Sequence, residues 1–166
     1  MAISVQPLDR QHDVKSFRCG APALDDWLQK MARQHQEKGV SRTYVIIDDG
    51  SPEKIMGFYA ITICEVHSAE LPPDMAKKLP RSIPGLRLGR LATDLKYQGG
   101  KDLRIGETLL VDAMLRAKAL SKQAGGYALF VDAKDDKAAG FYMKYGFVPL
   151  PDNPLKLLTP MTSIPE

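Results

Sequence analysis

The chain has 166 residues, carries a formal net charge of +3, and is 44% hydrophobic and 26% charged. These values are ordinary for a globular protein, and a chain of this length buries a core without metal ions or disulfides. Its apolar runs are too short to cross a membrane, residues 1–10 lack the apolar centre of a signal peptide, and Cys19 and Cys64 lack metal-ligand spacing. We therefore expect one domain over residues 1–166 that is cytoplasmic, metal-free and not bound to a membrane.

The first half of the chain predicts strands and helices that alternate irregularly. Residues 3–8 predict a strand, and Asp9 predicts the N-cap of a short helix that ends near residue 17. Pro22 and Gly39 bound a helix over residues 22–38. Residues 43–48 and 55–66 predict two strands joined by a turn. A short basic helix between prolines is expected within residues 71–81.

The second half predicts a strand over residues 86–94, a long helix over 105–123 and a buried strand over 127–132. A helix capped by Asp135 or Asp136 and two closing strands, at 147–150 and 155–161, follow. The strand–helix–strand unit predicts a right-handed parallel connection, whereas the hairpins of the first half predict antiparallel pairing. The sum is a mixed α/β sheet with helices on its faces.

The loop before the long helix is the most informative segment for function. Gly99, Gly100 and Gly106 allow close approach of a bulky anion, and Lys101 and Arg104 add cationic donors beside the amide-rich start of a helix. A plain surface loop is the alternative interpretation. The loop matches neither the dinucleotide G-x-G-x-x-G pattern nor a P-loop ending in G-K-[ST], which leaves coenzyme A as the common diphosphate carrier.

Several motifs in order resemble the GNAT superfamily and, more narrowly, the acetyltransferase toxins of type II toxin–antitoxin systems. The resemblance covers nearly the whole chain. The motifs that carry it are Phe17-Arg18-Cys19-Gly20 with Leu24 and Trp27-Leu28, Ser41-Arg42-Thr43-Tyr44, Arg90-Leu91-Ala92-Thr93-Asp94 with Tyr97-Gln98-Gly99, and Ala139-Gly140-Phe141-Tyr142 with Tyr145-Gly146-Phe147-Val148-Pro149. One departure is that Arg104 stands where the family's phosphate loop has its first glycine.

The resemblance implies a GNAT fold: a mixed, mostly antiparallel central sheet of six to seven strands with a V-shaped splay and helices on both faces. It also implies that acetyl-CoA is the co-substrate. The pantetheine arm would lie along the strand over residues 86–94, and the pyrophosphate would lie at the loop that follows this strand. The implied cofactor-binding residues are Leu91, Ala92, Thr93, Gln98, Gly99, Gly100, Lys101, Arg104, Ile105, Gly106, Asp135, Ala138 and Phe141.

Tyr142 matches the family tyrosine that protonates the leaving thiolate, and a tyrosine with a pKa near ~10 is protonated at neutral pH. The family supplies no fixed general base. His35, His67 and Glu65 are candidates by residue type alone, and a lone histidine is more often structural.

The acceptor implied by the resemblance is the α-amino group of aminoacyl-tRNA, whose acetylation blocks translation. The sequence supports this through two segments rich in Lys and Arg, which suit RNA phosphates but are also common on surface helices. The candidate tRNA-binding residues are Lys30, Arg33, Lys38, Arg42, Lys77, Lys78, Arg81 and Arg90. Arg90 could instead face the active site, because it adjoins the part of the strand that is expected to receive the acetyl group. A ribbon-helix-helix antitoxin and a homodimer are expected by the same analogy.

Two other functions stay open. The chain could be a GNAT enzyme that acetylates a small amine or a protein N-terminus, in which case no wide basic surface is needed. It could also be a non-catalytic acetyl-CoA-binding module, because the altered phosphate loop leaves cofactor affinity open and folds are reused for other roles. The sequence does not identify the amino acid on the tRNA.

Overall fold

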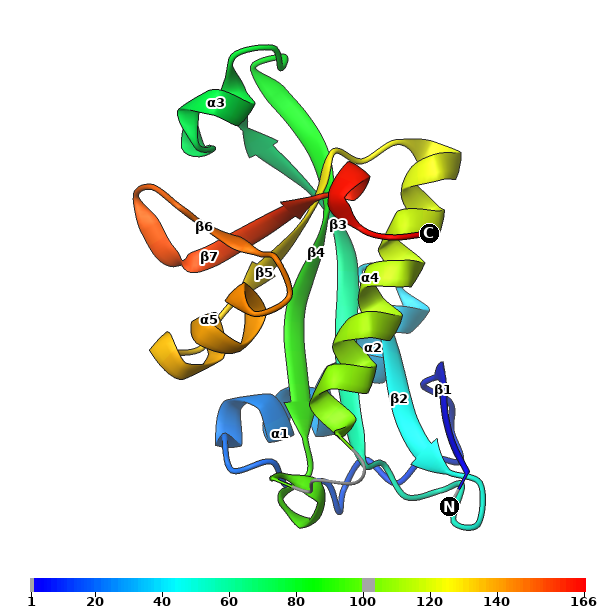
Figure 1. Cartoon of the computed structure of the whole chain (residues 1–166). Coiled ribbons are helices and arrows are strands. Elements are labelled where there is room, and N and C mark those ends of the chain that lie inside the picture. The colour runs from blue at the N-terminus through cyan, green and yellow to red at the C-terminus, as the bar shows by residue number, and fades with distance from the viewer. Residues whose placement is uncertain (1, 100–103) are drawn as a thin grey trace. The chain divides into compact units, whose positions relative to one another are not determined.

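The computed structural model describes residues 2–99 and 104–166. The elements, labelled in Figure 1, are β1 (Ile3–Pro7), α1 (Pro22–Lys30), α2 (Ala32–Glu37), β2 (Arg42–Asp48), β3 (Gly57–His67), α3 (Pro73–Ala76), β4 (Ser82–Thr93), α4 (Ile105–Ala124), β5 (Ala128–Asp132), α5 (Asp136–Met143), β6 (Val148–Leu150) and β7 (Asn153–Pro160), with 3-10 turns at Ser68–Glu70, Leu95–Tyr97 and Met161–Ser163. Within the described residues, none of the helices combines the length and apolarity needed to cross a membrane.

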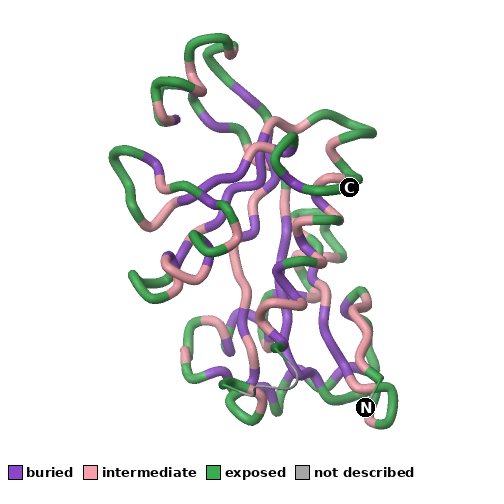
Figure 2. Tube along the Cα trace, viewed as in Figure 1, coloured by how far each residue is buried: buried purple, intermediate pink, exposed green. Residues whose placement is uncertain are grey.

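The strands form a seven-stranded sheet in the order β1-β2-β3-β4-β5-β7-β6. β4 pairs in parallel with β5, and the pairs β1–β2, β2–β3, β5–β7 and β6–β7 are antiparallel. The mixed, mostly antiparallel sheet expected from the sequence is therefore confirmed. Figure 2 shows that buried residues concentrate along the strands, as expected for the core of an α/β protein.

One compact unit comprises Met1–Thr62 and Arg90–Ala113. Its core gathers large apolar side chains from the N-terminal segment, α1, β2, β3 and the end of β4, among them Phe17, Trp27, Leu28 and Phe58. Phe17 meets Phe58 edge to face at 5.4 Å between ring centroids. Side chains of this size each contribute on the order of 1.5–3 kcal/mol when buried, so this cluster fixes the end of β4 against α1.

The second compact unit comprises Ile63–Gly89 and Met114–Glu166. The parallel pairing runs from Gly85 opposite Ala128 to Leu88 opposite Val131. Gly85 is required there, because an added Cβ would lie 2.6 Å from the Phe130 ring and 2.9 Å from the Ala128 carbonyl oxygen. A core that includes Phe130 stabilises this unit.

Three expected elements differ from the structure by more than two residues. The short helix after Asp9 is absent: residues 9–17 form turns, because His12 Nδ1 accepts the Asp9 N–H and the Asp13 carboxylate accepts the Ser16 N–H, so these donors are engaged in local turns. The helix over 22–38 is interrupted at Met31, which has φ −116° and separates α1 from α2. β4 begins at Ser82, four residues before the expected start.

Candidate active site

The end of β4 is held by a polar clasp that joins it to the Phe-Arg-Cys-Gly segment. The buried Asp94 carboxylate accepts the Arg18 N–H at 3.1 Å and the Lys96 N–H at 3.0 Å, and the Leu95 N–H donates to the Arg18 carbonyl at 2.8 Å. A buried carboxylate that accepts backbone N–H groups is satisfied without a counter-ion. This clasp fixes the backbone immediately after the residues expected to receive the acetyl group.

The Gln98 side chain completes the clasp. Its amide Nε2 donates to the Cys19 carbonyl and to the Thr93 carbonyl, each at 2.7 Å. Gln98 was expected to contact the cofactor, but both of these bonds are made to the protein's own backbone. The Thr93 carbonyl is engaged by the same contact.

Arg90 lies on the same strand, three residues before Thr93. Its guanidinium carbon is 4.2 Å from the centroid of the Trp27 ring, a cation–π contact. Trp27 also stacks on Phe58 at 6.1 Å with 12° between the planes, and meets His35 edge to face at 5.8 Å. Arg90 was predicted as a tRNA-binding residue, and the structure fixes its charged group on an aromatic ring.

Arg104, the residue immediately before α4, has an unusual backbone conformation. Its φ is +43°, and among the described residues it is the non-glycine residue with positive φ. This left-handed region favours glycine, the residue that the resemblance leads us to expect at this position. The Arg104 carbonyl accepts the Thr108 N–H and hydroxyl, and its exposed guanidinium lies 3.4 Å from the Glu107 carboxylate.

The first turn of α4 packs tightly against β3. A Cβ added to Gly57 would lie 2.8 Å from Leu109 Cδ1, 2.9 Å from the Ala92 carbonyl oxygen and 3.0 Å from Ile105 Cγ2. Gly57 thus lets the start of α4 and the end of β4 both approach β3 closely.

The rest of the expected phosphate loop is only partly described. Gly99 is exposed with φ +69°, and Gly106 is half-buried in the first turn of α4. The predicted contacts of Gly100 and Lys101 lie outside the described residues.

Tyr142 lies on α5 in the second unit. It is 5% exposed and packs edge to face on Phe141 at 5.4 Å and Phe147 at 5.7 Å. Burial, with a smaller effect of the Asp132 charge, raises the pKa of the Tyr142 hydroxyl well above its ordinary value. The hydroxyl makes no hydrogen bond to another described residue, so it remains available as a donor.

Three other residues expected at the cofactor, Asp135, Ala138 and Phe141, lie at the start of α5 or within it. The Asp135 carboxylate accepts the Ala138 N–H at 2.8 Å and forms the N-cap that the sequence predicted. Phe141 is half-buried and also packs on Tyr145 at 5.3 Å. Their arrangement gives these residues a structural role in the start and packing of α5.

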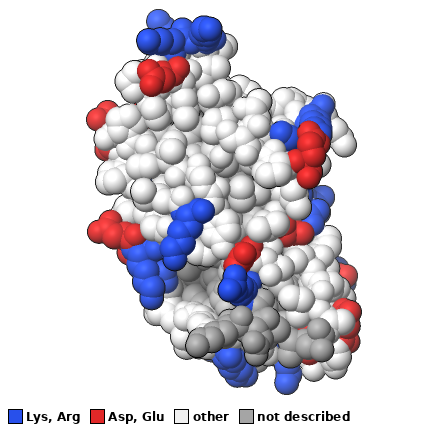
Figure 3. Space-filling model, viewed as in Figure 1, with Lys and Arg blue, Asp and Glu red and all other residues white. Residues whose placement is uncertain are grey.

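The predicted RNA-binding cations differ in what they contact. The Arg33 guanidinium donates to the carbonyls of Asp9, Arg10 and His12, and therefore organises the N-terminal turn. Lys30 lies 3.9 Å from Asp26 on the surface. The remaining cations are exposed: Lys38 and Arg42 near β2, and Lys77, Lys78 and Arg81 between α3 and β4. Figure 3 shows Lys and Arg side chains gathered over the tip that carries α3.

The structure does not favour any of the three candidates for a general base. His67 Nδ1 accepts the Ala69 N–H, and Glu70 reaches back to the His67 N–H, so this histidine caps a turn. Glu65 is exposed, and His35 packs on Trp27.

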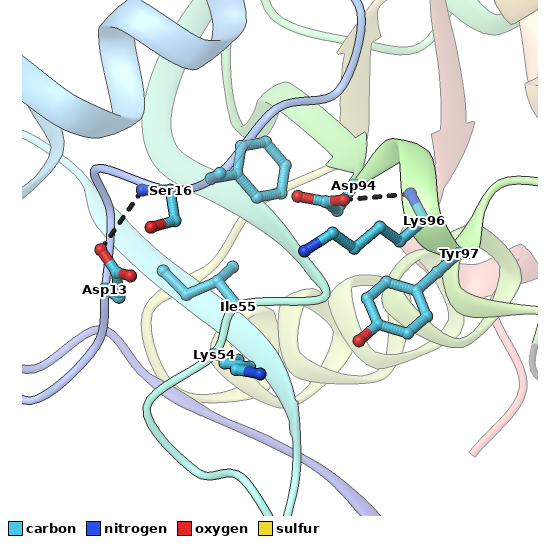
Figure 4. A pocket seen from close by; sticks show the side chains of 8 residues that line it. Asp13, Ser16, Lys54, Ile55, Asp94, Lys96 and Tyr97 are labelled. Carbon is cyan, nitrogen blue, oxygen red and sulfur yellow. Dashed lines mark hydrogen bonds between the residues drawn. The ribbon is translucent and has the colours of Figure 1, made fainter.

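A cavity of about 140 Å³ lies beside the clasp (Figure 4). Its carboxylates serve local turns: Asp13 accepts the Ser16 N–H and Asp94 accepts the Lys96 N–H, as the dashed lines show. No local sequence pattern indicates this cavity, because its walls come from three separate segments: the N-terminal turn, the β2–β3 connection and the residues after β4. The lining residues are Asp13, Ser16, Phe17, Lys54, Ile55, Asp94, Lys96 and Tyr97.

The two cysteines are free thiols, Cys19 buried and Cys64 half-buried. No group of three or more His, Cys, Asp or Glu side chains within residues 2–99 and 104–166 has an arrangement that could hold a metal ion.

Comparison with known proteins identifies relatives across most of the chain. No family model matches. A tRNA-acetylating toxin of Mycobacterium tuberculosis is 37% identical over 146 residues, which cover 88% of this chain and 84% of that protein. A probable toxin TacT of Sinorhizobium fredii is 30% identical over 170 residues, with coverage of 96% and 92%.

Solved structures agree with these relatives. AtaT complexed with acetyl-methionyl-tRNAfMet superposes with a TM-score of 0.89 at 31% identity, covering 98% of this chain and 97% of that chain. A mutant of KacT gives a TM-score of 0.90 at 28% identity, covering 99% and 98%. A mutant of AtaT bound to acetyl-CoA and to the C-terminus of the antitoxin AtaR gives 0.82 at 28% identity, covering 98% and 95%. Identity at this level across nearly the whole length means that the chain belongs to the GNAT acetyltransferase toxins of type II toxin–antitoxin systems.

Proposed function

We propose that this protein transfers the acetyl group of acetyl-CoA to the α-amino group of an aminoacyl-tRNA and so acts as a toxin that blocks translation. The relative named as a tRNA-acetylating toxin, the AtaT complex with an acetylated aminoacyl-tRNA and the AtaT complex with acetyl-CoA support the reaction. The observation in this chain that carries the proposal is the φ of +43° at Arg104, a conformation typical of glycine at the residue immediately before α4, where a pyrophosphate binds.

The strand before that loop holds the pantetheine arm. Backbone groups of Leu91 and Ala92 pair with its amides as a neighbouring strand would. The Thr93 carbonyl accepts a hydrogen bond from the Gln98 side chain, which holds the end of this strand. A backbone N–H of this strand also polarises the thioester carbonyl, so that negative charge on its oxygen is stabilised during transfer. The pyrophosphate lies at the start of α4, where Arg104, Ile105 and Gly106 present the helix N-terminus.

The transfer forms a bond between the acceptor nitrogen and the acetyl carbon and breaks the bond from that carbon to sulfur. The acceptor must be neutral to attack, and an α-amino group with a pKa near ~8 is partly neutral at physiological pH without a dedicated base. Tyr142 donates its hydroxyl hydrogen to the departing sulfur, and the proton that the acceptor nitrogen loses on becoming an amide returns through solvent to Tyr142. Its raised pKa keeps the hydroxyl protonated between turnovers, and the hydroxyl has no hydrogen-bond partner among the described residues.

The exposed cations Lys77, Lys78 and Arg81 hold RNA phosphates by contacts that weaken with salt. A Lys77→Glu/Lys78→Glu double variant is expected to raise the KM for charged tRNA and leave coenzyme A binding unchanged. The matched control is Lys15→Glu/Lys54→Glu, which makes the same charge change at two other exposed lysines. Equal KM values for the two double variants would remove this surface from the proposal.

The expected protein partners are also inferred from the family. An antitoxin that inhibits the enzyme is supported by the AtaT–AtaR complex, and we propose that it is of the ribbon-helix-helix type, that the enzyme is a homodimer and that it acts in the cytoplasm. Co-expression with the product of the neighbouring reading frame, followed by size-exclusion chromatography with light scattering, tests the partner and the oligomer together.

The decisive experiment is mass spectrometry of charged bulk tRNA after incubation with the protein and acetyl-CoA. An N-acetyl group on the aminoacyl moiety is the expected product. If acetyl-CoA is consumed only with free small amines, the enzyme is a small-amine GNAT. If coenzyme A binds without turnover on any amine, the non-catalytic module is the correct interpretation.

A further inference from the structure

Arg90 packs on Trp27 beside the residues that are proposed to hold the acetyl donor. The guanidinium lies 4.2 Å from the Trp27 ring centroid, and Trp27 is itself fixed by ring contacts with Phe58 and His35. Trp27 is 6% exposed, and its indole N–H has no hydrogen-bond partner among the described residues. Its position is therefore set by packing alone, which makes the ring a platform for Arg90.

The direction in which Arg90 points follows from the strand. Side chains two residues apart on a strand share a face, and Ala92 belongs to the same buried cluster as Trp27. Arg90 therefore projects on the α1 face of β4, one residue before Leu91. Because Arg90 is half-buried rather than enclosed, part of it remains accessible to a ligand.

We propose that Arg90, whose guanidinium packs on Trp27, stacks against the terminal base of the acceptor RNA and so sets the position of the aminoacyl group. This inference rests on the proposed function, because it assumes an aminoacylated RNA acceptor. Unpaired bases at RNA ends are commonly recognised by stacking on aromatic rings and on the planes of arginine guanidinium groups. A guanidinium already packed on an indole loses little side-chain freedom when a base binds.

The test compares three acceptors that carry the same amino acid: the charged tRNA that the protein acetylates best, the 3′-aminoacyl-adenosine, and the amino-acid methyl ester. The first two contain the terminal base and the third does not. In Arg90→Lys the charge remains but the planar group is lost. One stacking contact of this kind corresponds to roughly a 5- to 30-fold change in binding, so kcat/KM is expected to fall by about that factor for both base-containing acceptors, mainly through KM, and to stay unchanged for the methyl ester.

Two variants of the platform separate positioning from folding. Trp27→Phe keeps an aromatic face and loses no hydrogen bond, because the indole N–H has none, and it is expected to retain the preference for base-containing acceptors. Trp27→Leu removes the face and should reproduce the selective loss seen in Arg90→Lys. Melting temperatures measured in parallel identify any variant that is simply unstable, and Arg10→Lys, at an exposed site on the N-terminal turn, is the matched arginine control.

Equal losses for all three acceptors in Arg90→Lys would overturn the proposal, because a purely structural arginine affects every substrate. A loss confined to intact tRNA would also overturn it, since Arg90 would then bind RNA away from the terminal base. These outcomes are distinct from failure of the proposed function, in which the wild-type protein would acetylate none of the aminoacyl acceptors.

Discussion

Removing the Tyr142 hydroxyl is the sharpest test of the chemistry, because the structure predicts opposite outcomes for stability and for rate. The side chain is 5% exposed, yet its hydroxyl has no hydrogen-bond partner within the described residues. Tyr142→Phe keeps the ring contacts with Phe141 and Phe147 and breaks no internal bond. The free energy of unfolding should therefore change by less than about 1 kcal/mol, the value of one typical hydrogen bond.

The rate should change far more. Loss of a general acid lowers turnover by about 10²- to 10⁴-fold, which corresponds to roughly 3–5 kcal/mol of transition-state stabilisation. The assay is single-turnover acetylation of charged tRNA with saturating acetyl-CoA, with coenzyme A binding measured by calorimetry and stability by urea denaturation. Tyr127→Phe, on another tyrosine of the same unit, is the control. A Tyr142→Phe variant that acetylates at the wild-type rate would refute the assignment, and a variant that loses rate and stability together would show a structural role instead.

Four further substitutions test single positions through stability or cofactor binding. Gly57→Ala should destabilise the protein by about 1–3 kcal/mol in urea denaturation, because its Cβ would overlap the start of α4, whereas Gly140→Ala, in open space within a helix, should stabilise it by about 0.5–1 kcal/mol. Arg104→Gly should relieve the positive φ and raise stability by up to ~1 kcal/mol, but weaken coenzyme A binding measured by calorimetry, and unchanged affinity would exclude Arg104 from the anion site. The pKa of His12 is lowered, chiefly by burial. As pH falls below about 6.5, the unfolded chain therefore takes up a proton at His12 before the folded chain does. The wild-type protein should lose more stability between pH 7 and 5.5 than His12→Gln, and equal losses would contradict this.

The sequence predicted the elements best where a single physical signal dominates. α4 repeats apolar residues at helical spacing, and Ile105, Leu109 and Ala113 are each 1% exposed or less. The parallel pairing of β4 with β5 was predicted from the strand–helix–strand order in which α4 connects the two strands. These features depend on local pattern, so they can be read without knowledge of the tertiary structure.

The segment after Asp9 was wrongly predicted as a helix. A capping residue indicates that a nearby backbone N–H will be hydrogen-bonded, but it can cap a turn as well as a helix. His12 and Asp13 satisfy those donors in turns, and Arg33, far away in the sequence, bonds three carbonyls of the same segment. Contacts at such separation leave no periodic signal. The Arg90–Trp27 contact was missed for the same reason, since 63 positions separate its two members in the sequence.

The family motifs in this chain serve two different physical purposes, and the structure separates them. The Phe17-Arg18-Cys19-Gly20 segment, Asp94 and Gln98 make hydrogen bonds with one another and with the end of β4. A strand whose last backbone groups must bind a ligand needs such support, because it has to keep its shape without a continuous ladder of neighbours. These residues therefore belong to the scaffold, although they recur with the activity.

Arg104 stands apart from that scaffold. A non-glycine residue at positive φ costs roughly 1–2 kcal/mol, and backbone strain of this kind persists at functional sites, where the side chain has another use. The Glu107 contact does not account for it, because the pair is exposed and its members are 71% and 37% accessible. Binding to a phosphate of the co-substrate would account for it, since a charge-assisted hydrogen bond to a phosphate is about twice as strong as a neutral one. We therefore propose that binding, rather than folding, determines the choice of side chain at Arg104.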